Sequence, residues 1–454
     1  MARQLLEAIL DNGVSNPNYF DGRLLTASAL RADQDAQRAR QRQLGQALGP
    51  GVVDGLWVTI DFAGTTSSPP LLGVGAGLAM NGHGQTLRLP AREVVALAPV
   101  TSPPPTGAGL FKTCEPPSAT VDAPADGFYL LVLSPASAYS GRAPISGLAV
   151  PSAGAGCGSD AAIEGVRLRS VALDPLAVTG VSTATRQQIT TLRAATSDAD
   201  LSKLRNLVAH VCLGTEPLAT FPVDPFALRI TDDGGTEPAL ADYGALDALV
   251  DADSLTDCDV PLALYYWRGN ALLFADNWSV RRRLAPPATA DAWPTLSGGR
   301  RRAEAEAALF QFQEQVTALV IGASNPTALR ALDCFAWLPP TGIVPLAGGG
   351  RRGFSDAAFF DGMKVSRAAD STLNPIYVDG ARVGELVSAS FAHLPIAAGP
   401  DEFMWLYRVR QNDLLPAESG TEYPYAMFAS GHLPYVGTAR FDLARWDRSN
   451  FGLL

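Results

Sequence analysis

The chain has 454 residues, of which 47% are hydrophobic and 18% are charged, and its formal net charge is −10. This apolar content supports buried cores, and the length predicts more than one domain. The acidic balance argues against binding to a phosphate backbone as the main activity. A charged fraction below the roughly 25% of typical soluble domains favours surfaces that are covered in an assembly.

The cysteines and the N-terminus indicate where the chain is made. Five cysteines are widely spaced without a CxxC pair: Cys114, Cys157, Cys212, Cys258 and Cys334. This pattern excludes a zinc ribbon and predicts reduced thiols, with Cys212 and Cys334 in the core. The N-terminus lacks the features of a signal peptide, and no apolar run has the length of a membrane helix. We expect cytoplasmic synthesis, with release from the cell inside an assembled particle as an open alternative.

The first predicted elements are helical. A short helix is expected over residues 1–10, and a second begins at Thr26 or Ser28, either of which can cap it, and ends near Leu48 before a Gly-Pro-Gly terminator. Leu30, Leu44 and Leu48 are the only large apolar residues of the second helix after its first turn. A helix this polar gains little from packing on its own domain. We therefore expect a solvated strut or part of an interface.

Strand patterns dominate the middle of the chain. Asn81-Gly82 predicts a hairpin turn that leaves His83 exposed, and the turn at 268–270 predicts a second hairpin. Strands are expected at 52–60, 72–80, 86–89, 128–133, 166–171, 260–267 and 272–274, with a helix at 185–211.

The polar, Pro- and Gly-containing stretch 285–299 predicts a domain boundary, followed by a helix at 303–321 and short strands that include 403–409. The expected class is α+β, a β-rich multidomain chain with a long polar N-terminal helix and a few further helices. The predicted domains are an N-terminal docking segment and helix (1–50), a β-rich domain with an inserted helix (51–285) and a C-terminal α+β domain (300–454).

Residues that carry chemistry are scarce. The histidines, His83, His210, His393 and His432, are isolated and lack metal-ligand spacing, and His210 is expected as a hydrogen-bonded core residue. No GxSxG motif and no phosphate-binding glycine loop is present. The sequence therefore predicts no enzyme, no cofactor and no metal site.

Three clusters have a functional and a structural interpretation. The acidic stretch Asp251–Asp259 offers carboxylates for Ca²⁺, but it lacks the EF-hand glycine and final glutamate, so a solvated loop is favoured. The aromatic residues at 265–267, 405 and 407 are expected in the core, with sugar stacking as the alternative. The basic runs 281–283, 300–302 and 351–352 are interpreted as solvated faces or contacts for acidic partners.

Several motifs carry a family resemblance. Three motifs resemble the N-terminal part of proteins encoded in the gene clusters of contractile injection systems: residues 18–26 (NYFDGRLLT), 51–56 (GVVDGL) and 75–82 (GAGLAMNG). These systems are phage-tail-like particles. Residues 256–264, 276–283 and 337–340 are similar to further segments of the same group. The resemblance implies a baseplate-peripheral, cage-like or fibre-like component. Ser28-Ala29-Leu30 departs from the family, in which an acidic residue occupies the helix start.

These patterns predict a structural subunit that packs on other particle proteins and on copies of itself, without nucleic acid binding or membrane insertion. The candidate docking residues are Tyr19, Phe20, Arg23, Leu24, Leu30 and Leu44. A second hypothesis is a tail-fibre-like module whose C-terminal domain binds a glycan or a surface protein. A third is a hydrolase with a pocket built from distant carboxylates.

Overall fold

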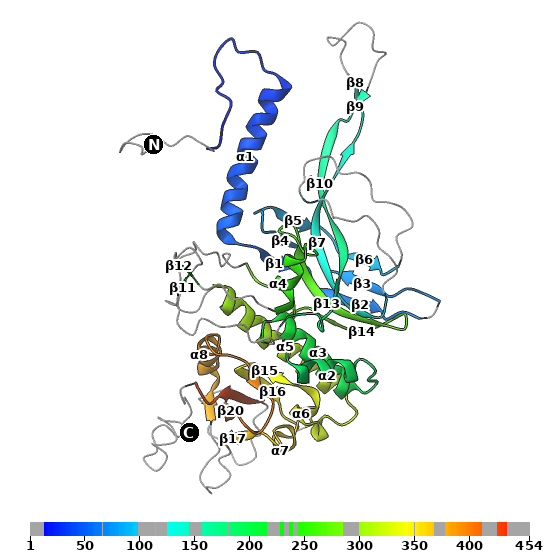
Figure 1. Cartoon of the computed structure of the whole chain (residues 1–454), viewed down its shortest axis with the longest axis vertical. Coiled ribbons are helices and arrows are strands. Elements are labelled where there is room, and N and C mark those ends of the chain that lie inside the picture. Colours follow the sequence, from blue (N-terminus) through cyan, green and yellow to red (C-terminus); the bar gives the residue numbers. More distant parts are fainter. Residues whose placement is uncertain are drawn as a thin grey trace.

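The computed structural model describes residues 13–65, 67–98, 114, 125–144, 157–179, 181–215, 228–230, 236–238, 244–284, 299–348, 350–366, 377–410 and 425–433. These residues combine helices with mostly antiparallel sheets, which confirms the α+β class (Figure 1). The expected helix over 1–10 lies outside the described residues, as does nearly all of the expected boundary at 285–299. None of the described helices is both long and apolar enough to cross a bilayer.

The long N-terminal helix forms where the sequence predicts it. Helix α1 spans Ala27–Leu48, and the Thr26 hydroxyl caps it by accepting a hydrogen bond from the Ala29 amide at 3.2 Å. Gly49 ends the helix with a φ of 83°, a conformation that glycine adopts without steric cost.

Two three-stranded sheets follow α1. One consists of β1 (Gly51–Gly55), β4 (Gly77–Met80) and β5 (Thr86–Leu89), and the other of β2 (Val58–Phe62), β3 (Leu71–Val74) and β6 (Glu93–Ala96). The predicted strands 52–60 and 72–80 are each divided between the two sheets. The chain turns at Leu56, whose φ is 57°, and a Cβ on Gly77 would lie 2.3 Å from the Asp54 carbonyl oxygen. Because the two strands come this close where they pass from one sheet to the other, glycine is required at Gly77.

A four-stranded sheet forms the centre of the body. Its order is β10 (Ala161–Leu173), β7 (Gly127–Ser140), β13 (Val260–Arg268) and β14 (Ala271–Asp276). Alternate residues point to opposite faces. Phe128, Leu130 and Tyr266 pack against helices, whereas Leu131 and Tyr265 pack against the two three-stranded sheets. The predicted strands and the hairpin at 268–270 are confirmed.

The helices on this sheet are α2 (Thr183–Leu192), α3 (Asp198–Cys212) and α4 (Gly244–Asp251). The predicted helix at 185–211 is therefore two helices. The Ser197 hydroxyl accepts a hydrogen bond from the Asp200 amide at 3.1 Å, which starts a new helix after a break.

A second set of elements follows helix α5 (Gly299–Gly322). Phe312 of α5 packs on one face of a mixed sheet, and Leu386 of α8 (Gly380–Ser390) packs on the other. This sheet consists of β16 (Thr341–Pro345), β21 (Tyr425–Ser430), β20 (Phe403–Arg410), β17 (Lys364–Ser366) and β18 (Tyr377–Asp379). Shorter elements are β8 (Ala143–Pro144), β9 (Cys157–Gly158), β11 (Leu228–Ile230), β12 (Thr236–Pro238), η2 (Pro326–Ala328), α6 (Ala331–Cys334), β15 (Trp337–Leu338), α7 (Asp356–Phe359) and β19 (Ile396–Ala397).

The aromatic clusters are core residues, as expected. Tyr265, Tyr266, Trp267, Trp405 and Tyr407 are all buried, with at most 5% of their surface exposed. Their rings are therefore unavailable for stacking on a sugar.

The basic run at 281–283 differs from its interpretation as a solvated face. Arg281 is buried, its guanidinium carbon lies 4.1 Å from the centre of the Trp57 ring, and it donates to the Leu56 carbonyl at 3.0 Å. Burial lowers the pKa of Arg281 to about 10. In contrast, Arg283 is 74% exposed. The buried arginine replaces solvent with ring and carbonyl contacts.

The acidic loop is solvated only in part. Asp251, Asp253 and Asp257 are exposed, but Asp259 is buried and pairs with Arg169. Burial alone would raise the pKa of Asp259, and hydrogen bonds from Arg169 and Ser134 outweigh it, so the pKa lies below its ordinary value. Asp259 therefore acts as a structural anchor in front of β13.

The cysteine expectation is wrong in one respect. Cys114 and Cys258 form a disulfide across 144 residues of sequence, which spacing alone does not reveal. Cys212 and Cys334 are buried free thiols, as expected. His83, expected to be exposed, is half-buried in the turn between β4 and β5.

A buried polar cluster joins the central sheet to the C-terminal elements. The carboxylate of Asp276, at the end of β14, is fully buried and accepts from the Arg205 Nε at 2.5 Å and the Gln311 Nε2 at 3.1 Å. Arg205 also donates to Glu314 at 2.6 Å. Burial works to raise the pKa of Asp276, but the charge of Arg205 and bonds from Ser279 hold it below its ordinary value. The cluster thus ties α3, β14 and α5 together.

Asp276→Asn is expected to lower the free energy of unfolding by about 3–5 kcal/mol, because it leaves the Arg205 charge buried without its main partner. Chemical denaturation of both proteins measures the difference. Glu385→Gln, which removes an exposed ion pair with Arg382 on α8, is the matched control and should cost less than about 1 kcal/mol. Equal effects of the two changes would contradict the structural role of the cluster.

His210 lies beside this cluster. It is 1% exposed, and its Nδ1 is 2.9 Å from the Thr215 Oγ1, which confirms a hydrogen-bonded core residue at that nitrogen. Burial lowers the pKa of His210 to about 3, and the nearby Asp276 acts in the opposite direction. The imidazole is therefore neutral in the folded chain at any pH near neutrality.

Because the folded-state pKa of His210 is below the ordinary value of 6.5, only the unfolded chain binds this proton between those pH values. Stability should fall as pH drops from 6.5 toward 3, by about 1.4 kcal/mol per pH unit from this group. Denaturation of His210→Gln should lack this part of the slope. Thr215→Val keeps the imidazole and should retain it; a slope unchanged in His210→Gln would refute the assignment.

Candidate docking surface

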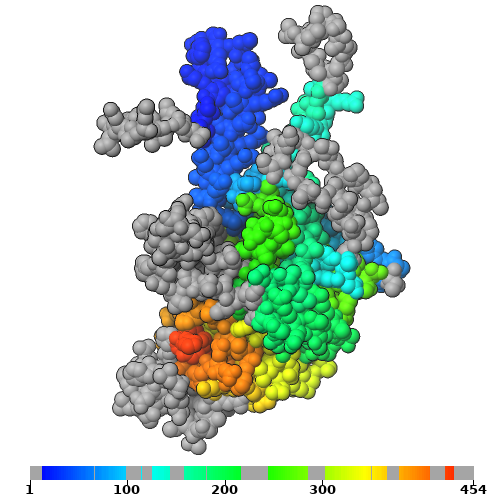
Figure 2. Space-filling view, in the orientation of Figure 1, coloured from blue at the N-terminus to red at the C-terminus, as the bar shows by residue number. Residues whose placement is uncertain are grey.

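Helix α1 stands clear of the body. Its 22 residues give a length of about 33 Å, and only Ala29, Ala36 and Gly45 are buried. Figure 2 shows the helix as a separate column above the body. The expectation of a polar helix with few intramolecular partners is confirmed. Its many Ala, Arg, Gln and Leu residues have high intrinsic helix propensity, which supports a helix that packs on little.

One face of α1 carries an uncharged stripe that was not predicted from the sequence. Its residues are separated alternately by four and three positions, and all of them are exposed: Leu30, Gln34, Gln37, Gln41, Leu44 and Leu48. The three leucines, at the two ends of the stripe, are 51%, 70% and 56% exposed. Alternating spacings of this kind form the contact seam of coiled coils, in which polar residues specify register at a cost in stability. We refer to these six residues as the α1 seam.

Charged residues flank the α1 seam. Asp33 lies on one side and Arg38 on the other, five residues later. In a parallel pair of such helices, these are the positions where side chains of neighbouring chains meet. Asp33 of one copy would then face Arg38 of the next, and this attractive pairing would add to the contacts that Arg38 makes with Asp35 and Glu164 of its own chain.

The segment ahead of α1 exposes further apolar side chains. Leu24 is 81%, Phe20 64% and Tyr19 44% exposed. The Tyr19 hydroxyl donates to the Ala29 carbonyl at 3.4 Å, and the Arg23 guanidinium lies 5.8 Å from the centre of the Tyr19 ring. These contacts fold the segment against the start of α1. The six candidate docking residues thus lie on one continuous part of the chain, and their docking role stays a prediction.

The base of α1 is anchored through two glycines. A Cβ on Gly45 would lie 2.3 Å from the Gly84 carbonyl oxygen, and one on Gly84 would lie 2.2 Å from the Arg42 carbonyl oxygen. Gly84 also has a φ of 72°. Only residues without a Cβ permit this approach of helix and turn. The orientation of α1 therefore depends on backbone contact with the β4–β5 turn.

A long hairpin extends in the same direction as α1 (Figure 1). It consists of the outer parts of β7 and β10, where Tyr139 is 62% and Ile163 is 55% exposed. The Arg38 Nη2 lies 3.2 Å from the Glu164 Oε1, so an ion pair connects helix and hairpin. The two projections extend from the same end of the molecule (Figure 1).

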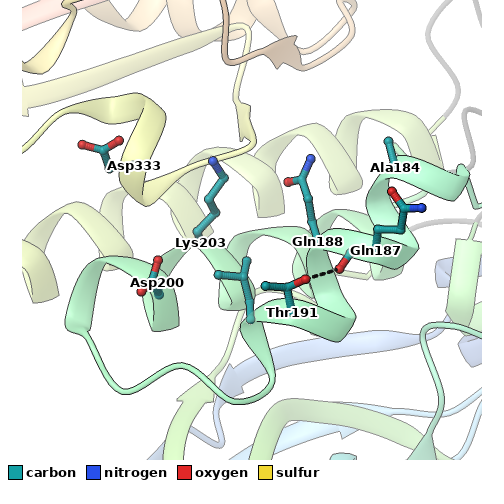
Figure 3. Close-up of a pocket in the computed structure, with 8 residues that line it drawn as sticks. Ala184, Gln187, Gln188, Thr191, Asp200, Lys203 and Asp333 are labelled. Carbon is teal, nitrogen blue, oxygen red and sulfur yellow. Dashed lines mark hydrogen bonds between the residues drawn. The ribbon is translucent and has the colours of Figure 1, made fainter.

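A shallow depression of about 510 Å³ lies between α2, α3 and α6, as Figure 3 shows. The Lys203 ammonium donates to the Leu332 carbonyl at 2.7 Å, and the Thr191 hydroxyl donates to its own helix at Gln187. Asp200 and Asp333 are exposed at its rim. The lining residues offer no nucleophile beside a base, so this depression does not support the hydrolase hypothesis.

Gly45→Ala is expected to loosen α1 from the body, because the added methyl group overlaps the Gly84 carbonyl. Amide hydrogen exchange should become faster in α1 while the protection of the central sheet is retained. Gly384→Ala in α8 is the matched control, since a Cβ there meets no atom within 4 Å. It should be neutral or stabilising by up to about 1 kcal/mol. Unchanged exchange in Gly45→Ala would show that the glycine contact does not anchor the helix.

Comparisons with known proteins find little similarity. No family model matches the chain, and no curated protein matches it. A solved structure titled "Crystal structure of TssK" is similar over 91% of this chain and 91% of that chain, at 10% identity and a TM-score of 0.20. At this TM-score the similarity carries no functional conclusion.

Proposed function

We propose that this protein is a structural subunit of an oligomeric particle and that copies associate through the α1 seam. The observation that carries this proposal is a heptad-spaced, uncharged stripe, every member of which is exposed, on a helix with few buried residues. Burial of one leucine side chain contributes about 1.5–3 kcal/mol. The single chain gains only part of this at Leu30, Leu44 and Leu48, which stay more than half exposed, so pairing with another helix is the step that would bury the rest of their surface.

The charged residues beside the α1 seam favour a second copy of this chain as the partner that covers it. Parallel α1 helices place Asp33 opposite Arg38 of the neighbour. The three glutamines in the middle of the seam can each hydrogen-bond to their counterparts, because an amide side chain both donates and accepts. A parallel arrangement also suits the outline of the molecule, because every body would lie at the same end of the shared helices (Figure 1). Closed rotational symmetry is the usual result of such contacts.

The proposed particle is of the contractile injection type. The support is the resemblance of residues 18–26, 51–56 and 75–82. In the structure, the first motif leads into α1, and the other two pair as β1 and β4 next to the turn that anchors the helix. The motifs thus precede the projecting helix and build part of its base. A docking element shared with the family would explain why these three segments resemble it.

The tail-fibre-like alternative has less support. Its glycan-binding form requires accessible aromatic rings, and the residues weighed for that role are buried in the core. A fibre that binds a surface protein predicts that truncation after about residue 296 removes cell binding and leaves assembly intact.

Light scattering coupled to gel filtration tests the association of the full chain. The wild type should elute as a multiple of 47.7 kDa, and Leu30→Asp combined with Leu44→Asp should weaken association by at least about 100-fold. Ile321→Asp is the matched control, because Ile321 is 73% exposed at the end of α5 and lies outside the seam. Circular dichroism verifies that every variant is folded.

A monomeric wild type at tens of micromolar chain would overturn self-association, as would equal effects of the seam and control variants. Particle membership is tested separately by co-expression with sheath, tube and spike proteins. Co-purification that the seam variant loses and Ile321→Asp retains would support the particle role.

A further inference from the structure

Three metal-ligating side chains from distant parts of the sequence meet at the base of α1. The imidazole of His83 and the sulfurs of Cys114 and Cys258 offer ligand atoms that all lie within 4.8 Å of one another. Both cysteines are buried and joined as a disulfide, and His83 is half-buried beside them. Within the described ranges, no other group of three such side chains converges in this way.

The position of His83 is fixed by its turn. Asn81 is fully buried, and its Nδ2 donates to the Gln85 Oε1 at 2.8 Å and contacts the Cys258 carbonyl at 3.4 Å. The backbone amide of Gln85 in turn donates a hydrogen bond to the Asn81 Oδ1 at 2.9 Å. A Cβ on Gly82 would lie 3.0 Å from Asp257. The turn therefore stays against the Cys258 segment whether or not the sulfurs are bonded.

We propose that the reduced chain binds one Zn²⁺ through His83, Cys114 and Cys258. Bonds of about 2.3 Å to sulfur and 2.0–2.1 Å to nitrogen in a tetrahedral site separate the ligand atoms by roughly 3.5–3.8 Å. The His83 nitrogen already lies within 4.8 Å of both sulfurs, so small side-chain shifts complete the site. The Gln85 Oε1 is 3.8 Å from the Cys114 sulfur and offers an oxygen near the three ligands.

Reduction of the disulfide and binding of zinc balance in electrons, protons and charge. Exchange with a dithiol breaks the sulfur–sulfur bond, oxidises the dithiol to its cyclic disulfide and leaves Cys114 and Cys258 as thiols. Each thiol releases its proton to solvent when it binds the metal. Two thiolates and a neutral imidazole then hold Zn²⁺ with no net charge, which suits a largely buried site.

The disulfide and the zinc site would both connect the segments of Cys114 and Cys258. The disulfide ties Cys114 to Cys258, and zinc would tie both to the turn that contacts α1 through Gly84. The chain would thus keep a cross-link at the helix base under oxidising and reducing conditions. This inference does not depend on the proposed particle role.

The test uses the full chain, reduced with a phosphine and then freed of reductant without exposure to air. Reduced wild type should bind one equivalent of zinc, and the oxidised chain should bind none at this site. Cobalt added to the reduced chain should give a thiolate charge-transfer band and the visible bands of tetrahedral Co²⁺. His83→Ala should weaken zinc binding by roughly tenfold or more. Cys258→Ser should abolish the charge-transfer contribution of that sulfur.

His432→Ala, at an exposed histidine, and Cys212→Ala, at a buried free cysteine, are the matched controls and should retain zinc. The comparison of reduced and oxidised wild type needs no variant, so a folding defect in Cys258→Ser cannot decide the outcome. Absence of stoichiometric zinc in the reduced wild type would overturn the proposal. Retention of full affinity in His83→Ala, or equal loss in the controls, would overturn it as well.

Discussion

A carboxylate without access to water, that of Asp276, is the constraint around which the body is organised. A buried charge is tolerated only where charged and polar partners replace its hydration. Asp276 receives the Arg205 guanidinium, the Gln311 amide and the backbone amides of Trp278 and Ser279. These donors come from α3, α5 and the segment after β14. The position of the mixed C-terminal sheet relative to the central four-stranded sheet is therefore set by directional hydrogen bonds as well as by apolar packing.

Helix α1, which projects from the body, is stabilised without a buried core. Helix α1 places almost nothing in a core, and its local stability comes from helix propensity, the Thr26 cap and the glycine stop at Gly49. Its attachment to the body uses backbone contact at Gly45, an ion pair from Arg38 and a turn that is bound to the disulfide segment. A rigid body thus presents a helix whose apolar side chains remain available.

Local patterns predicted most single elements of this fold. The caps of α1, the hairpin turns at 81–82 and 268–270 and the continuous apolar strand at 128–133 all depend on residues close in sequence. Spacing could not predict that Arg281 and Asp259 are buried, or that Cys114 meets Cys258, because tertiary contacts decide these features. The α1 seam is different. Its four-three spacing was visible in the sequence, and the structure adds that every member of the stripe is exposed.

The Gly45–Gly84 contact also has a mechanical consequence. A rod of about 33 Å that is held at one end acts as a lever, so a tilt of about 10° at the base would move its far end by about 6 Å. That displacement is comparable to a whole turn of helix. A ring of identical subunits tolerates little angular error per member if it is to close. The Gly45–Gly84 contact and the Arg38–Glu164 ion pair would thus set the angular accuracy of any ring that this chain forms.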